Sequence, residues 1–331
     1  MRVDVILPTY QGEAFVAEAL ESVLAQTHRD WHLTAIDDNS SDATWACLEA
    51  FRHSHPDHAD RITLLRNDQN IRAAACRMRA IASCDAPLIA FLDQDDLWLP
   101  ENLERQVAGL EREPSLDALH GDVEHIDVEG RLLEGASAFE NERRRRVDFA
   151  RLDREQTCRA LFKRNTIRLA SAIVRRDAFI QAGGFRGELF GGEDWEFWVR
   201  FASQFRIGHL PEILTKRRIH SGNTSTAQVL ARTPGLPQAL SILEAEQPSI
   251  AHLCADLCAE KRRALEGRLV LESSQAGRYA DAAAAAWKLL RITPWRAVNA
   301  IYLAIGISGP IGRSLVSLRR SLLVARNTTG R

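Results

Sequence analysis

Long apolar runs are missing from this sequence of 331 residues. A helix that spans a bilayer needs roughly 18–20 consecutive apolar residues, and the longest candidate, residues 297–311, is shorter and contains two glycines and a proline. The opening residues MRVDVILPTY carry a charge at Asp4 and lead directly into a strand-like run, so they do not resemble a signal peptide. We therefore expect a cytoplasmic protein, either free in solution or peripheral on the inner face of the membrane.

An excess of charge and a cysteine framework are absent as well. The formal net charge is −1, so bulk electrostatics give no reason to expect nucleic acid as a partner. The six cysteines are scattered along the chain, which indicates thiols in a reducing compartment rather than disulfides. Cys254 and Cys258 stand one helical turn apart, but no second pair of ligands lies near them in the sequence. We interpret them as small buried residues and not as a metal site.

What the first hundred residues do contain is a regular alternation of strand-like and helix-like segments. Their apolar patterns predict strands at 3–8, 32–37, 61–67 and 87–93, and helices at 13–26, 40–54, 72–83 and 101–112. Ser40 or Ser41 is placed to cap the second helix, and Pro100 to occupy the first turn of the fourth. This alternation predicts an α/β fold, a single Rossmann-like domain with a mainly parallel central sheet.

The remainder of the chain is less regular and then becomes helical. The patterns predict strands at 116–127 and 166–176, a polar loop at 134–148, an aromatic-rich helix at 191–205, and a strand and loop at 209–225. From about residue 226 the chain is mostly helical. We predict two parts, an α/β domain over 1–223 and a helical C-terminal region over 224–331.

Aromatic residues and arginines gather near the ends of the predicted C-terminal helices. They are Trp287, Arg291, Trp295, Arg296, Tyr302, Arg313, Arg319 and Arg320. Such residues can lie in a membrane interface. A helical subdomain packed on the first domain is the interpretation that we favour, and contact with a membrane interface stays open as the alternative.

Polar clusters follow three of the predicted strands: PTYQG after the first, DDNSSD after the second and DQDD after the fourth. Ligands of parallel α/β sheets bind beyond the carboxyl ends of the strands. The sheet is therefore expected to gather these clusters along one edge, where a site can form.

The cluster DQDD places Asp93 and Asp95 two positions apart, on the same side of an extended segment. Two unit charges about 4 Å apart repel by roughly 4 kcal/mol at an effective dielectric near 20, and a bound cation removes that cost. Hard oxygen ligands favour Mg²⁺ or Mn²⁺, often shared with the phosphates of a substrate. The alternative is a solvated acidic turn in which Asp96 caps the next helix.

Two further acidic positions have their own alternatives. Asp38 can accept a hydrogen bond from the imide N–H of a uracil or thymine, whereas Asp37 or Asp42 can simply cap the following helix. Glu193 and Asp194 follow a glycine pair at the start of a helix, where the helix dipole favours acids in any case. A catalytic base also needs a carboxylate held near a substrate hydroxyl, and the aromatic residues that follow Asp194 are candidates for apolar walls around it.

Taken together, VILPTYQGEAFVAEALESVLAQTHRDW, IDDNSSDAT, FLDQDDLWLPENLERQ and GGFRGELFGGEDWEFWVRFA resemble the inverting family 2 glycosyltransferases of the GT-A fold in order and in spacing. The resemblance covers about residues 1–223. It implies a nucleotide-sugar site in which Pro8, Thr9 and Tyr10 line the nucleoside pocket and Asp38 contacts the base. It further implies that Arg72 lies near the nucleotide and that Asp93 lies near the ribose or the metal. It also implies that Asp95 binds Mn²⁺ or Mg²⁺, that His220 lies near the diphosphate or the metal, and that Asp194 is the general base, supported by Glu193.

The sequence departs from the family pattern in several places. Gln11 stands where the family usually has Asn, and the third helix reads CRMRA where the family often has ARN and a glycine. These departures bear on donor specificity. The QxxRW motif of processive members is absent, so we expect transfer of a single sugar.

The expected function is metal-dependent, inverting transfer from a UDP- or dTDP-sugar to an acceptor hydroxyl, in cell-surface polysaccharide or glycan assembly. The expected partners are the nucleotide-sugar donor and a glycan or lipid-linked sugar acceptor. Two other classes are weighed against it, a nucleotide-sugar-binding module without activity and a nucleotidyltransferase. The second of these needs a glycine-rich, basic phosphate loop after the first strand, and PTYQGEAF is not such a loop.

Overall fold

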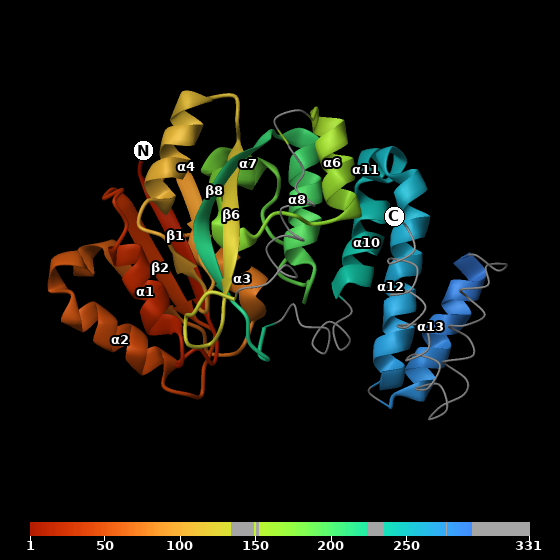
Figure 1. Ribbon diagram of the computed structural model, residues 1–331, viewed down its shortest axis with the longest axis horizontal. Coiled ribbons are helices and arrows are strands. Elements are labelled where there is room, and N and C mark those ends of the chain that lie inside the picture. Colours follow the sequence, from red (N-terminus) through yellow and green to blue (C-terminus); the bar gives the residue numbers. More distant parts are fainter. Residues whose placement is uncertain (134–148, 150–151, 224–234, 276, 293–331) are drawn as a thin grey trace. The chain divides into compact units, whose positions relative to one another are not determined.

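The computed structural model describes residues 1–133, 149, 152–223, 235–275 and 277–292 (Figure 1). The chain divides into two compact units, Met1–Gly222 and Asn223–Arg331. Predictions for the polar loop at 134–148 and for the aromatic residues and arginines beyond residue 292 fall outside the described residues.

The first unit is built on a mixed, mostly parallel sheet (Figure 1). Its strands in the described residues are β1 (Val3–Thr9), β2 (Trp31–Asp37), β3 (Ile62–Arg66), β4 (Leu88–Phe91), β5 (Leu97–Trp98), β6 (Ala118–Ile126), β7 (Ala172–Arg175) and β8 (Ile207–Arg218), in the spatial order β3-β2-β1-β4-β7-β6-β8-β5. β1 pairs in parallel with β2 and β4, β2 with β3, and β6 with β8. β7 runs antiparallel to both of its neighbours, as β5 does to β8. The predicted α/β class is confirmed.

Helices cover both faces of this sheet. They are α1 (Val16–Leu24), α2 (Thr44–Ser54), α3 (Arg72–Ile81), α4 (Asn102–Arg112), α6 (Arg154–Lys163), α7 (Arg176–Gln181) and α8 (Glu193–Gln204). Every residue of β1 is buried, as expected for a central parallel strand with helices on both faces. Alternate residues Val3, Val5 and Leu7 pack into a core shared with α1, α2 and α4.

An aromatic cluster fills the other face beside β4. Phe91 packs against Phe179 of α7 and against Phe185, with ring centroids 5.9 and 5.3 Å apart. Phe197 of α8 lies 5.1 Å from Phe179 and 4.7 Å from Phe185. Trp198, also fully buried, stacks edge-on against Phe197. This cluster fixes α8, and with it the acidic start of α8, against the sheet.

Three local predictions are wrong. Ser40 and Ser41 do not cap α2: Ala43 is its N-cap, Asp42 accepts from the backbone N–H of Thr44, and the hydroxyl of Ser40 accepts from Gln11 N instead. Pro100 precedes the N-cap of α4, which is Glu101. The strand expected at 166–176 begins only at Ala172, because a 3₁₀ turn, Leu169–Ser171, occupies the residues before it.

The second unit contains α10 (Gly235–Glu246), α11 (Pro248–Leu253), α12 (Ala255–Gln275) and α13 (Tyr279–Ile292). α12 and α13 pack through a small apolar cluster that includes Val270, Ala285 and Leu289. Trp287 on α13 is 59% exposed. None of the six cysteines of the chain, all of which are described, forms a disulfide. Within the described residues no helix has both the length and the apolar character needed to cross a bilayer.

We predict that Phe197→Ala lowers the free energy of unfolding by about 3–5 kcal/mol, because it leaves a cavity among four aromatic rings. Urea denaturation followed by tryptophan fluorescence measures the loss. Ile180→Ala on α7 is the matched control, since Ile180 is 49% exposed and its change should stay within about 0.5 kcal/mol. Equal losses for the two variants would contradict the packing described above.

Candidate active site

The backbone is strained at one edge of the sheet. Among the described non-glycine residues, Gln11, Asn39 and Arg72 have positive φ angles, of 51°, 61° and 72°. They follow β1, β2 and β3 respectively. Residues held in the left-handed region cost about 1–3 kcal/mol each and cluster at functional sites. The three parallel strands therefore deliver their strained turns to the same edge as the predicted acidic clusters.

The turn after β1 is tied to the loop after β4. Pro8 and Thr9 are buried, whereas Tyr10 is 47% exposed. The side chain of Gln94 accepts from Tyr10 N at 2.7 Å and donates to Tyr10 O at 2.9 Å. A side chain at Gly12 would collide with the amide of Gln94 and push it away from Tyr10, so glycine leaves room for the contact between the two loops. The exposed ring of Tyr10 is thus held next to the acidic loop.

Asp38 lies at the end of β2 and is only 3% exposed. Its Oδ1 accepts from Asn67 Nδ2 at 2.7 Å and from Ile71 N at 2.8 Å, and its Oδ2 accepts from Arg72 N at 2.7 Å. Those bonds offset the strain at Arg72, whose guanidinium lies 4.6 Å from the ring centroid of Phe190. Asp38 therefore organises the β3–α3 turn, and Oδ2, with one bond, is the oxygen with more capacity to accept another.

The loop after β4 holds three carboxylates. Asp93 Oδ1 accepts from Arg77 Nη2 at 2.6 Å. Asp95 Oδ2 lies 2.9 Å from His220 Nε2, so the structure brings together two residues that are 125 positions apart in the sequence. Burial first, and repulsion by Asp93 second, raise the pKa of Asp95, and the imidazole partly offsets this. Carboxylate and imidazole ligands suit a divalent cation that takes its remaining ligands from water and substrate phosphates.

Asp96 does not cap α4, contrary to the alternative drawn from the sequence. Its Oδ1 accepts from Arg218 N at 3.0 Å, and burial followed by repulsion from Asp95 and Asp93 holds its pKa well above the usual range. The Arg218 guanidinium is fully buried and donates to Asp95 O and, at 2.8 Å, to Glu18 Oε2. Arg218 also lies over the ring of Phe15, which contacts the ring of His220. This arginine fixes the backbone of the acidic loop.

The acids at the start of α8 are positioned by glycines. Gly191 and Gly192 have φ angles of 81° and 89°, which a residue with a side chain adopts only with strain. Asp194 Oδ1 accepts from Trp195 N at 2.7 Å, and Oδ2 from Asn165 Nδ2 at 2.9 Å. Burial is the largest cause of a raised pKa at both Glu193 and Asp194. Perturbed carboxylates of this kind are typical of catalytic sites.

The aromatic residues that follow Asp194 belong to the core. Trp195, Phe197 and Trp198 are at most 2% exposed, and the indole N–H of Trp195 donates to Leu161 O at 2.9 Å. They secure the helix that carries the acids, and their burial leaves no aromatic surface to form walls around a substrate.

The acidic loop and the start of α8 meet through a residue that the sequence did not single out. Arg77 of α3 bonds Asp93, and its Nη1 lies 3.9 Å from Glu193 Oε1. A signal was present: Arg77 falls three residues after Ala74 and three before Ala80, on the buried face of α3. A charged residue on an apolar helix face is rarely buried without a partner. Asn165 and Gln94, by contrast, carry no such mark in the sequence.

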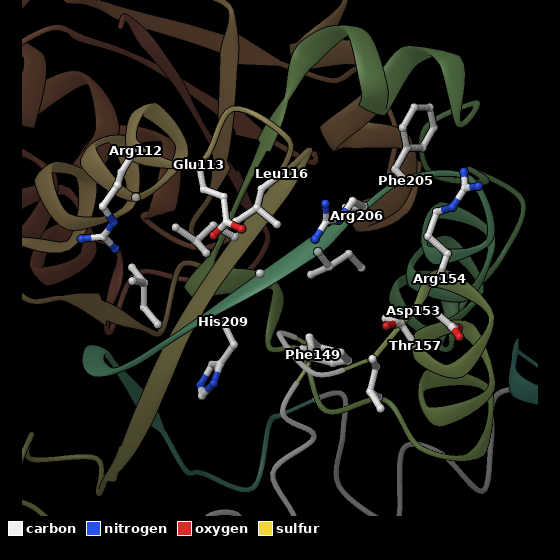
Figure 2. Close-up of a pocket in the computed structure, with 16 residues that line it drawn as sticks. Arg112, Glu113, Leu116, Phe149, Asp153, Arg154, Thr157, Phe205, Arg206 and His209 are labelled. Atoms are coloured by element: carbon white, nitrogen blue, oxygen red, sulfur yellow. The ribbon is translucent and has the colours of Figure 1, made fainter.

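A cavity of about 410 Å³ lies elsewhere in the first unit (Figure 2). Its walls come from the end of α4, the start of α6 and the first residues of β6 and β8, and Figure 2 shows Arg112, Glu113, Asp153, Arg154, Phe149 and Arg206 around it. None of the predicted site residues lines it. β6 and β4 both run antiparallel to β7, so the start of β6 lies at the opposite end of the sheet from Asp93. We assign this cavity no part in the chemistry at the acidic edge.

Comparisons with known proteins agree with this geometry. An uncharacterized glycosyltransferase of Methanocaldococcus jannaschii is 25% identical over 219 residues, which are 66% of this chain and 70% of that protein. The Escherichia coli UDP-Glc:alpha-D-GlcNAc-diphosphoundecaprenol beta-1,3-glucosyltransferase is 34% identical over 125 residues, 38% of this chain and 47% of that protein. The chain thus spans about half the length of the second relative.

Two solved structures share the fold. Staphylococcus aureus TarS 1-349 in complex with UDP-GlcNAc has a TM-score of 0.57 at 16% identity, covering 97% of this chain and 92% of that one. The mannosyltransferase PcManGT from Pyrobaculum calidifontis, in complex with GDP-Man and Mn²⁺, has a TM-score of 0.59 at 18% identity, covering 98% and 80%. Both likenesses support the predicted GT-A fold.

The family model described as "Glycosyl transferase family 2" matches residues 4–175. That segment contains the strained turns, Asp38, Arg77 and the whole acidic loop. It covers slightly more than half of the 331 residues, and the chain belongs to glycosyl transferase family 2.

Proposed function

We propose that this chain transfers a single sugar, with inversion, from a nucleoside diphosphate sugar to an acceptor hydroxyl, aided by Mn²⁺ or Mg²⁺. The observation that carries this proposal is the pairing of two acidic groups at one sheet edge. Arg77 links the loop after β4, which carries Asp93 and Asp95, to the start of α8: it bonds Asp93 and lies 3.9 Å from Glu193. One group is suited to bind a donor diphosphate and the other to activate an acceptor.

Asp194 is the proposed general base. It takes the proton of the acceptor hydroxyl while that oxygen attacks the anomeric carbon from the face opposite the leaving group. A carboxylate whose pKa is raised by burial is a better proton acceptor near neutral pH than an exposed aspartate. The bonds from Trp195 N and Asn165 Nδ2 fix the orientation of the carboxylate. Glu193, its neighbour on α8, supports it or contacts the acceptor.

The leaving group is a nucleoside diphosphate that gathers negative charge as the glycosidic bond breaks. Asp95 and His220 are the residues that would hold the divalent ion, because one carboxylate and one imidazole lie 2.9 Å apart beside the acidic loop. When bound, the ion supplies electrostatic stabilisation of the departing diphosphate. The half-buried carboxylate of Asp95, whose pKa is raised by burial and by Asp93, would be stabilised in its charged form by such a cation.

The nucleoside is proposed to lie along the turns after β1, β2 and β3. Tyr10 offers an exposed ring, Pro8 and Thr9 form the floor, and Arg72 and Asp93 flank the ribose and diphosphate. Oδ2 of Asp38 is the proposed acceptor for a base imide N–H. UDP- or dTDP-sugars are favoured on that chemistry, and TarS was solved with UDP-GlcNAc, although PcManGT was solved with GDP-Man.

The acceptor is proposed to be a glycan or a lipid-linked sugar of cell-surface polysaccharide assembly. The name of the Escherichia coli relative specifies a diphosphoundecaprenol acceptor. Contact with a membrane would involve α13, on which Trp287 is 59% exposed. Of the rival functions, an inactive binding module would not need the hydrogen bonds that orient Asp194. A nucleotidyltransferase would release pyrophosphate rather than nucleoside diphosphate.

Asp194→Asn should keep donor affinity and lower kcat by roughly 10²–10⁴-fold, the usual contribution of a positioned base. The measurement is release of nucleoside diphosphate in the presence of acceptor, with donor affinity from calorimetry. Asp177→Asn is the control, an exposed aspartate in the first turn of α7, and should behave as wild type. Near wild-type turnover by Asp194→Asn would remove Asp194 from the reaction.

Asp95→Ala should abolish the part of nucleotide binding that depends on the metal. With UDP and Mn²⁺ as probes, wild type should gain about 2.7 kcal/mol of stability at a hundredfold excess over Kd, seen as a rise in Tm that EDTA reverses. The variant should show no EDTA-sensitive rise. Asp85→Ala, whose side chain is 83% exposed, is the control. UDP binding by wild type that is indifferent to EDTA would rule out the metal role.

The rate should fall as pH is lowered through a pKa above the ordinary aspartate range. Asp194 acts as carboxylate, and because burial raises its pKa, protonation inactivates it at a higher pH than an exposed aspartate. Asn165→Ala removes a hydrogen bond to the charged form and should move this acid limb to still higher pH. The pH profile of kcat measures both effects. An acid limb in wild type near pH 4 would contradict the proposed base.

A further inference from the structure

A buried arginine, Arg77, lies between the two halves of the proposed site. Arg77 is 6% exposed and sits on the face of α3 that also buries Ala74, Ala80 and Ile81. Arg77 belongs to neither of the elements that carry the two acidic groups, since Asp93 follows β4 and Glu193 begins α8. Its side chain therefore reaches from a third element into the space between them.

The two terminal nitrogens of the guanidinium face different acidic groups. Nη2 donates to Asp93 Oδ1 at 2.6 Å, the length of a strong charge-assisted bond. Nη1 is 3.9 Å from Glu193 Oε1, a contact that is electrostatic rather than a hydrogen bond. The ring of Phe185 lies below, with its centroid 5.8 Å from the guanidinium carbon. The planar fork thus spans a gap that a single ammonium group cannot span.

Without Arg77, negative charge would exceed positive charge around the start of α8. Burial first, and then Asp194 and Asp93, raise the pKa of Glu193, and Arg77 is the cation that lowers it. Burial is the largest cause of the raised pKa of Asp194 and Asp93 adds to it, whereas Trp195 N, Arg168, before β7, and Arg77 of α3 lower it. Trp195 N and Asn165 Nδ2 complete its surroundings as neutral donors. Arg77 is therefore shared by both acids of α8 and by Asp93.

We propose that Arg77 is a positioning residue that holds donor-binding Asp93 and the catalytic start of α8 in one arrangement, so that donor and base meet at a fixed separation. This assignment rests on the proposed function. Arg77 touches no reacting atom. Its charge keeps the acids of α8 ionised, and its fork sets the distance between the two groups. These two contributions can be separated by substitution.

Arg77→Met removes both the charge and the fork. It should lower kcat by roughly 10- to 100-fold, as loss of residues that orient active groups commonly does, and should move the acid limb of the kcat profile to higher pH. Arg77→Lys keeps the charge but not the fork. It should leave the acid limb near its wild-type position while kcat stays reduced. UDP release from UDP-glucose with Mn²⁺, measured across the pH range, is the assay.

Thermal denaturation without any ligand supplies a readout that does not need turnover. At low pH the acids are protonated, and Arg77→Met should cost little. As pH rises, the variant must ionise Glu193 without Arg77 and Asp194 with the help of Arg168 alone, so its folded form binds protons more tightly than wild type does. Because stability falls with pH wherever the folded state binds more protons, the deficit in Tm should grow toward neutral pH. A loss of packing alone gives a deficit that does not change with pH.

Arg175→Met is the matched control. Arg175 is half-buried, and its guanidinium donates to the main-chain carbonyls of Leu116 and Leu110 at the far end of the sheet. Its deficit in Tm should be constant with pH, and its acid limb unchanged. A pH-independent deficit for Arg77→Met, or the same kinetic profile for Arg77→Met and Arg175→Met, overturns the assignment.

Failure of the proposed function has a different signature. In that case wild type releases no UDP from any donor, or Asp194→Asn matches wild type. The denaturation series then still decides whether Arg77 is the cation shared by the two groups. A deficit in Tm that grows with pH would support the role of Arg77 between the two groups. A deficit in Tm that stays constant with pH would contradict that role.

Discussion

Charge balance at one edge of the sheet is the constraint on which the site depends. Parallel strands deliver Asp93, Asp95 and Asp96 to the place where α8 begins with two further acids. Removing carboxylates from water is costly, and breaking a buried ion pair by deleting one partner typically costs about 3–5 kcal/mol. The structure meets this constraint with buried arginines from other elements. Arg77 bonds Asp93, and Arg218 bonds the backbone around Asp95 and the carboxylate of Glu18.

The same solution recurs behind the site. Glu196, one turn into α8, is fully buried and accepts from Arg200 Nε at 2.7 Å and from Arg186 Nε at 3.2 Å. Arg200 in turn donates to Gly184 O at 2.7 Å. This network joins α8 to the segment that leads into it, so the acids at its start are held by polar contacts on one side and by the Phe197 cluster on the other. These contacts restrict movement of the helix that carries Glu193 and Asp194.

The sequence predicted what depends on pattern and missed what depends on distant contacts. The alternation of apolar runs located β1 to β4 and the helices between them, and the position of DQDD after a buried strand located the acidic edge. The predicted cap at Ser40 does not form, because the Ser40 hydroxyl accepts from Gln11 N, 29 residues away, a contact that no local pattern reveals. Likewise Trp195 and Trp198 are candidates for walls of a site because they follow Asp194 closely in the sequence. In the structure both lie on the face of α8 that packs into the core. Arg77 and Asn165 needed the fold, since their partners come from other elements.

The glutamine between the acids of DQDD has a wider consequence. Gln94 satisfies both the N–H and the C=O of Tyr10, as a neighbouring strand would, although no strand is there. The side-chain amide therefore continues the hydrogen-bonding pattern of the sheet by one residue beyond the last backbone pair. The turn that carries the exposed tyrosine ring and the loop that carries the carboxylates are consequently joined through one side chain. A bound molecule that displaces either of them must move the other with it or break the bonds of Gln94.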